Sequence, residues 1–194
     1  GMVEYLYDNH NIVRYEGTSA STLRNSRLFG IGFPNDFGPN NPQNHAAIMM
    51  YTSQDLVIEQ SEIHDAYVAV FPKGGDGGHV LRNNLIHDCE RAFRLSYHTD
   101  VRIHQNVVPG WGWAIQPAEN LSGVAFFNNT VLGGRSGVDN WFPIAGLAVF
   151  NNVFASTEHP FYFEGGVGEL ASNRNLFFEL TSFVPGGTLA GWQA

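Results

Sequence analysis

Cysteine and lysine are nearly absent from this sequence of 194 residues, and each scarcity excludes a class of protein. The single cysteine, Cys89, excludes an intrachain disulfide framework and a zinc site built from several cysteines. Lysine occurs once, charged residues make up 14% of the chain, and the formal net charge is -8. Because phosphate backbones are bound by basic stripes, this balance argues against a nucleic-acid partner. No apolar run approaches the roughly 18 residues of a membrane-spanning helix, so no membrane span is predicted.

Asparagine and glycine are abundant instead, with 18 and 22 copies. Long surface helices are rich in Lys, Glu and Ala, so this composition favours a β fold with many turns. Hydrophobic residues make up 43%, which is enough for a packed core and argues against disorder. We expect one domain over residues 1–194, either complete or a fragment of a longer protein.

An internal repeat predicts the fold. Six similar segments carry a polar anchor residue, and the anchors follow one another at spacings of 23, 22, 23, 23 and 23 residues. The anchors are Ser61, Asn84, Asn106, Asn129, Asn152 and Asn175. The residues five and three positions before the anchors are apolar except His79 and Ser172, and this spacing puts them on one face of a strand. Three short strands per repeat, with no helical stretch, predict an all-β parallel solenoid of about seven coils of 22–23 residues.

This pattern resembles the right-handed parallel β-helix of the pectate-lyase-like superfamily over most of the chain. The resemblance implies that Asn84, Asn106, Asn129, Asn152 and Asn175 stack as a ladder inside one turn. It also implies a polysaccharide or oligosaccharide substrate lying along the first parallel sheet. The resemblance also implies that the protein is bacterial and is secreted, cell-surface or periplasmic.

Two features interrupt the repeat. Residues 32–45 contain an insertion rich in Pro, Asn and Gly, which predicts a long loop beside the first sheet. The chain is expected to begin in the middle of a coil, without the capping helix of the family. Open strand edges at that end predict either a fragment or association with another surface through this uncapped N-terminal coil.

Outward-facing residues of the first sheet form the predicted glycan groove. The row predicted from the repeat is Arg14, Met49, Lys73, Arg94, Gln116, Asp139 and Tyr162. The substrate-binding candidates are Gln116, Asp139 and Tyr162, together with Tyr97, His98, Trp113 and Trp141 in or beside the turns. Aromatic rings pack against the apolar face of a sugar, and polar side chains bond its hydroxyls. The alternative is a row of ordinary exposed residues.

Lys73 and Arg94 are the catalytic candidates. Lys73 is the only lysine and lies in a glycine-rich turn after a first-sheet strand. In lyases of the superfamily a Lys or Arg removes the proton next to a uronate carboxylate, and a second cation or Ca²⁺ neutralises that carboxylate. Neighbouring Arg91 and Arg94 would lower the pKa of such a lysine. A solvated turn lysine is the alternative, and Ca²⁺ is expected only with a uronate substrate.

Two Ile-His-Asp triplets, 23 residues apart, offer weak metal candidates. His64 and His87 should stack one coil apart, near enough to share a metal ion with Asp88 nearby. Repetition alone also stacks like residues, so no metal is predicted from this pattern. A hydrolase pair formed by Asp139 and Glu164 is a further alternative.

Three functions from different classes stay open at this point. The first is a carbohydrate-active enzyme, with a polysaccharide lyase preferred to a glycoside hydrolase. The second is a non-catalytic module that binds glycan in the same groove, and the third is a structural solenoid. The negative net charge suits neutral glycans better than polyanionic uronates.

Overall fold

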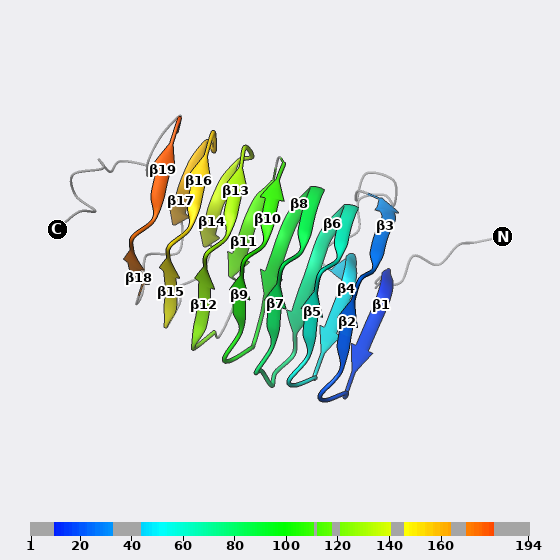
Figure 1. Cartoon of the computed structure of the whole chain (residues 1–194). Coiled ribbons are helices and arrows are strands. Elements are labelled where there is room, and N and C mark those ends of the chain that lie inside the picture. The colour runs from blue at the N-terminus through cyan, green and yellow to red at the C-terminus, as the bar shows by residue number, and fades with distance from the viewer. Residues whose placement is uncertain are drawn as a thin grey trace.

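The computed structural model describes residues 10–32, 44–110, 112–117, 121–140, 146–163 and 170–180. In these ranges the chain forms 19 strands. Figure 1 shows the strands stacked side by side, from β1 in blue at one end to β19 in orange at the other. No helix in the described ranges has the length and apolar character needed to cross a membrane.

The bounds of the strands follow the predicted repeat. In chain order they are β1 (Asn11–Glu16), β2 (Thr22–Arg24), β3 (Arg27–Gly32), β4 (Ala46–Tyr51), β5 (Val57–Glu59), β6 (Glu62–Lys73), β7 (Val80–Arg82), β8 (Leu85–Leu95), β9 (Arg102–His104), β10 (Val107–Pro109), β11 (Trp113–Pro117), β12 (Val124–Phe127), β13 (Thr130–Leu132), β14 (Ser136–Asn140), β15 (Leu147–Phe150), β16 (Val153–Ala155), β17 (His159–Phe163), β18 (Leu170–Asn173) and β19 (Leu176–Phe178).

Each coil contributes one strand to each of three parallel faces. The first sheet contains β1, β4, β11, β14, β17 and the C-terminal halves of β6 and β8. The second sheet is the separate seven-stranded sheet with the order β18-β15-β12-β9-β7-β5-β2. The third sheet contains β3, β10, β13, β16, β19 and the N-terminal halves of β6 and β8. The long strands β6 and β8 run around the corner between the third and first sheets, so these two sheets are hydrogen-bonded into one.

The all-β parallel solenoid is confirmed, whereas the number of coils is slightly smaller than predicted. About five turns form the solenoid, against the seven coils expected from the repeat. The difference lies at the ends of the stack. Strands β1, β2, β18 and β19 alternate between half-buried and exposed residues and contain no fully buried side chain. The five turns between them hold the buried core.

A two-residue turn joins the second sheet to the third in every coil. Its first residue has a left-handed backbone, as in Asn83 with φ of 55°, Asn128 with φ of 56° and Asn151 with φ of 55°. Asparagine is among the few residues other than glycine that adopt this conformation readily. The second residue of the turn is the anchor. Where two asparagines are adjacent in the sequence, the first therefore provides the left-handed backbone and the second provides the buried side chain.

The asparagine ladder is confirmed by its hydrogen bonds. The Asn129 amide nitrogen donates to the Asn152 side-chain oxygen at 3.1 Å and to the Ile103 carbonyl at 2.9 Å. The Asn129 side-chain oxygen accepts from the backbone and side-chain nitrogens of Asn106, both at 3.0 Å. The same pattern runs from Asn84 to Asn175. The ladder therefore provides partners for buried polar groups that a turn would otherwise leave without them.

Two buried histidines lie in the turn that leads from the first sheet to the second. His79 and His98 are both 0% exposed, and their ring centres are 5.0 Å apart. The Leu56 backbone N–H donates to His79 Nδ1 at 3.2 Å, so the unprotonated nitrogen has a structural role. Burial, followed by the nearby His98, lowers the pKa of His79 from 6.5 to about 4. Burial also lowers the pKa of His98.

Replacing Asn129 by Leu should lower the free energy of unfolding by about 1–3 kcal/mol, because buried carbonyl and amide groups lose their partners. Chemical denaturation at neutral pH measures this loss. Asn175→Leu is the matched control, since Asn175 is only half-buried at the end of the ladder and should cost less. Equal losses in the two variants would contradict a stabilising role for the buried ladder.

Stability should fall as the pH falls from 6.5 to 4. In this window His79 takes up a proton in the unfolded chain but not in the folded one, so acid favours unfolding. The full effect of one such histidine is roughly 3 kcal/mol at the acidic limit. Urea denaturation across this range measures the free energy of unfolding, which should depend less steeply on pH in His79→Asn than in the wild type. The Asn Oδ1 can still accept from the Leu56 backbone N–H. Identical slopes for the wild type and His79→Asn would rule out His79 as the cause.

Candidate functional site

The outer face of the first sheet carries two rows of side chains, three residues apart along each strand. Two consecutive residues between the rows point into the core, as Ala114 and Ile115 do in β11. The first outer row comprises Asn11, Ala46, Val68, Arg91, Trp113, Ser136 and His159. The second outer row comprises Arg14, Met49, Phe71, Arg94, Gln116, Asp139 and Tyr162.

The predicted row is therefore right except at Lys73. Phe71 takes the predicted place of Lys73, because Val70 pairs with Phe93 and the coil register is 23 residues there. Lys73 precedes Arg94 by only 21 residues and lies two positions further along the strand. It pairs with Tyr51 on one side and with Ser96 on the other.

The tryptophan cleft lies over the last three strands of the first sheet. It has a volume of about 350 Å³ and is lined by Trp113, Arg135, Ser136, Asp139, Glu158, His159 and Tyr162. The His159 and Tyr162 ring centres are 5.6 Å apart, and His159 Nε2 lies 3.5 Å from the Glu158 carboxylate. Three of the predicted glycan-binding residues, Trp113, Asp139 and Tyr162, thus meet at one cleft.

Arg91 holds Trp113 of the tryptophan cleft in place without lining the cleft itself. Its guanidinium carbon lies 4.5 Å from the ring centres of both Tyr67 and Trp113. Its Nε donates to Gln116 Oε1 at 2.6 Å, and both Arg91 and Gln116 are buried. Arg135 lies on Trp113 as well, at 5.5 Å. These cation–π contacts hold the indole in place before any ligand arrives.

The lysine cleft is a second hollow, over the first three strands of the same sheet. Its volume is about 380 Å³, and it is lined by Arg14, Glu16, Asn44, Met49, Tyr51 and Lys73. Lys73 Nζ donates to Asn44 Oδ1 at 2.6 Å. Lys73 and Arg94 approach the same Phe71 ring, with distances of 5.7 Å and 4.9 Å to its centre. The two catalytic candidates are therefore neighbours, although they do not share a row.

The other predicted residues lie away from these clefts. Tyr97 is 44% exposed at the surface, whereas the neighbouring His98 is fully buried against His79 and contributes to packing in the turn. Trp141 lies outside the described residues, as do Glu164 and nearly all of the loop predicted at 32–45. The N-terminal coil predicted to associate with another surface consists of β1, β2 and β3 at one end of the stack, and this association stays a prediction.

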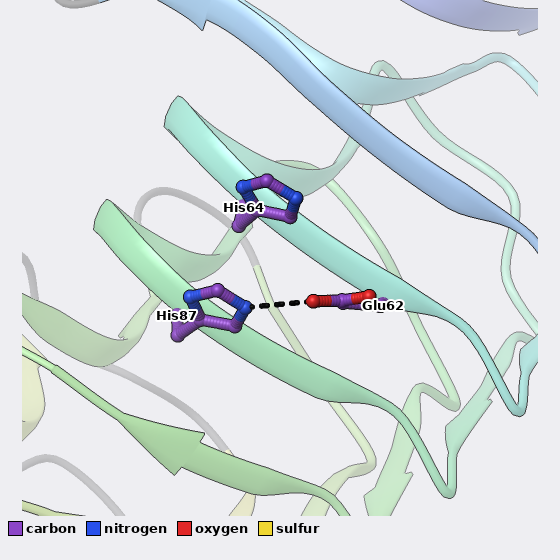
Figure 2. Close-up of side chains that lie close together, drawn as sticks. All are labelled: Glu62, His64 and His87. Atoms are coloured by element: carbon purple, nitrogen blue, oxygen red, sulfur yellow. Dashed lines mark hydrogen bonds and ion pairs between the residues drawn. The ribbon is translucent and has the colours of Figure 1, made fainter.

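The two predicted histidines meet a third residue on the outer face of the third sheet. One ligand atom from each of Glu62, His64 and His87 lies within 4.8 Å of the others. Figure 2 shows the two imidazole rings one above the other, with the Glu62 carboxylate directed at His87. The rings are parallel within 6°, with centres 4.8 Å apart. We call these three residues the histidine cluster.

Asp88 lies behind the histidine cluster and is not a member of it. The Asp88 carboxylate is 2.8 Å from His87 Nδ1, and the Asp65 carboxylate is 2.8 Å from His64 Nδ1. Burial lowers the pKa of His87, but its hydrogen bonds with Asp88 and Glu62 outweigh burial and raise it overall. The hydrogen bond from His87 lowers the pKa of Glu62, and the Arg27 charge acts in the same direction.

Sequence reasoning missed Glu62, Arg14 and the charged rim of the tryptophan cleft. Glu62 stands two positions before His64, and alternate residues of a strand share a face, so this member of the cluster could have been found. Arg14 was placed in the outer row but was not connected with Lys73. Arg135 and Glu158 lie outside or at the edge of their strands, where the repeat gives no register.

Comparisons with known proteins bear on the fold. No curated protein matches the sequence. One similar solved structure is that of the Streptococcus pneumoniae surface protein and adhesin PfbA, with a TM-score of 0.44 and 11% identity over 89% of this chain and 63% of that chain. This chain thus spans less than two thirds of the length of that protein. Residues 5–156 match the family described as right handed beta helix region, and since this is more than half of the sequence, the chain belongs to the right-handed β-helix family.

Proposed function

We propose that the protein binds a polysaccharide along the outer face of its first sheet, with the tryptophan cleft as the main subsite. The observation that supports this function most strongly is the meeting of Trp113, Asp139 and Tyr162 with His159 at one hollow of about 350 Å³. Rings can pack against the apolar faces of a sugar, while carboxylate, imidazole and hydroxyl groups bond its hydroxyls. A secreted or cell-surface location is part of this proposal.

The charges of the tryptophan cleft favour a neutral sugar. Arg135 brings one positive charge, and Asp139 and Glu158 bring two negative charges. A uronate carboxylate would meet a lining with more acidic than basic groups there, whereas neutral hydroxyls can both donate to the carboxylates and accept from the guanidinium.

The length of the sheet favours a chain rather than a single sugar. The tryptophan cleft is centred on β14 and the lysine cleft on β4, four strand spacings apart. At about 4.8 Å per spacing the two clefts are roughly 19 Å apart on one face. A ligand that used both would lie across the strands, parallel to the axis of the solenoid.

Tyr162→Ala should weaken the binding of a neutral oligosaccharide about 10-fold, or roughly 1–2 kcal/mol, because a ring contact is lost. A glycan array followed by calorimetry with the best ligand provides the measurement. Tyr162→Phe keeps the ring and should retain most of the affinity. The control is Phe127→Ala, a ring on the second sheet, which should not change binding. A Tyr162→Ala protein with full affinity would place the glycan elsewhere.

A polysaccharide lyase is the second candidate, favoured by the positive charge of Arg94 beside Lys73. Arg94 shares the Phe71 ring with Lys73 and would lower the pKa of the lysine, whereas the charge of Arg14 in the same cleft is compensated by Glu16 at 2.9 Å. A neutral Lys73 amine would take the proton next to a uronate carboxylate. Arg94, or Ca²⁺, would stabilise the charge that develops on that carboxylate. The electron pair of the broken C–H bond would form the carbon–carbon double bond of the product as the bond to the leaving sugar oxygen breaks, and the protonated Lys73 amine would return its proton to that oxygen.

Incubation with uronate polymers should then raise the ultraviolet absorbance of the unsaturated product. Lys73→Ala should abolish this signal, and Arg94→Ala should reduce turnover by about 10²–10³-fold, since the lost charge acts mainly in the transition state. Arg102→Ala, which removes an exposed arginine of the second sheet, is the control and should leave the rate unchanged. Neutral glycan binding without any product from uronates would exclude the lyase and keep the binding function.

A further inference from the structure

We propose that the histidine cluster is a binding site for a divalent transition-metal ion of the zinc class, with His64 Nε2, His87 Nε2 and a Glu62 carboxylate oxygen as protein ligands. The cluster lies on the third sheet and is separate from both clefts of the first sheet. Two imidazole nitrogens and one carboxylate oxygen suit Zn²⁺, Ni²⁺, Cu²⁺ or Fe²⁺ better than the hard ions Mg²⁺ and Ca²⁺.

The side-chain hydrogen bonds already direct both Nε2 atoms to the site. Each histidine has its Nδ1 against the carboxylate of the next residue, at 2.8 Å for both His64–Asp65 and His87–Asp88. A carboxylate behind the ring holds the proton on Nδ1 and makes the other nitrogen a better ligand. The repeated His-Asp pair thus supplies two ligands with their supporting groups. A metal ion would replace the proton that lies between His87 Nε2 and Glu62 Oε1, which are 3.2 Å apart.

The tautomer of His64 follows from its other partner. Arg27 Nε donates to His64 Nε2 at 3.2 Å. A guanidinium has no acceptor, so Nε2 of His64 must carry the lone pair, and its proton must be on Nδ1 facing Asp65. This is the form that binds a metal ion.

Arg27 occupies the position of a cation in this structure. Its Nε also lies 3.1 Å from Glu62 Oε2, so one positive group satisfies two of the three proposed ligands. The Arg27 side chain is 62% exposed and can turn towards solvent without opening a cavity. We therefore expect a metal ion to displace Arg27 and the arginine to compete with it.

The separations require a modest closure of the cluster. Nitrogen and oxygen ligands lie about 2.0–2.2 Å from Zn²⁺, which puts tetrahedral ligands roughly 3.3 Å from one another. The three ligand atoms are within 4.8 Å now. Rotation of the half-buried Glu62 and His87 side chains can close this gap, while His64 is held in place between Phe29 and His87.

Calorimetric titration of the chelator-treated full chain with ZnCl₂ tests the proposal. One Zn²⁺ per chain is expected. His87→Asn should reduce the affinity by more than about 10-fold, and Asp88→Asn by about 10–100-fold through the supporting group. Arg27→Ala should raise the affinity, because the competing cation is gone. Circular dichroism checks that each variant is folded.

His104→Asn is the matched control, since this histidine lies on the second sheet with Gln105 and Phe127 as its neighbours, and it should not change the titration. Tighter binding by Arg27→Ala, lost again in Arg27→Ala/His87→Asn, would identify this cluster as the site. Unchanged affinity in His87→Asn, or no Zn²⁺ binding by Arg27→Ala, would overturn the proposal. Neither result depends on glycan binding, so this inference and the proposed function can fail separately.

Discussion

Parallel pairing of each coil with the next, at a register of 22 or 23 residues, is the constraint on which the rest of this structure depends. The same backbone bond recurs at 2.9 Å from Val107 to Asn84, from Thr130 to Asn106 and from Val153 to Asn129. A buried asparagine amide is satisfied only if the neighbouring coil presents its own asparagine at the same height. A slip of one residue would break the ladder and turn alternate side chains to the wrong face. The backbone pairing and the asparagine ladder therefore both require the same register and stabilise it together.

The same register creates the surface sites. A row of side chains at 4.8 Å spacing brings together residues that are far apart in sequence, and their chemistry then depends only on which residues occur at that position. Arg91 beside Trp113, and His64 between Phe29 and His87, are both products of such rows. A cleft forms where a large side chain lies next to a small one in the same row, as Trp113 does next to Ser136.

The regular strands and the two-residue turn with its asparagine ladder could be predicted from sequence, whereas the turns between the first and second sheets could not. Asn84 to Asn175 and their apolar neighbours recur at a fixed spacing, so their places follow from strand geometry alone. Lys73 and His98 lie at or beyond strand ends, where coils differ in length and the spacing gives no position. The pKa of the Cys89 thiol in β8 is raised to about 12, mainly by burial and only secondarily by the charges of Asp65 and Asp88. Burial inside a turn depends on tertiary packing, which a repeat does not encode.

The division of the clefts between different coils has an energetic consequence. In a solenoid each coil contacts only its neighbours, so free-energy coupling is a nearest-neighbour property and decays along the stack. The lysine cleft and the histidine cluster are built on the first coils, and the tryptophan cleft on β11, β14 and β17. Local opening of one end of the rod would thus disturb the first two together and leave the third intact. The effects of substitutions at the two ends on the free energy of unfolding should be additive. Arg27, Lys73 and their neighbours, in contrast, belong to one cooperative unit.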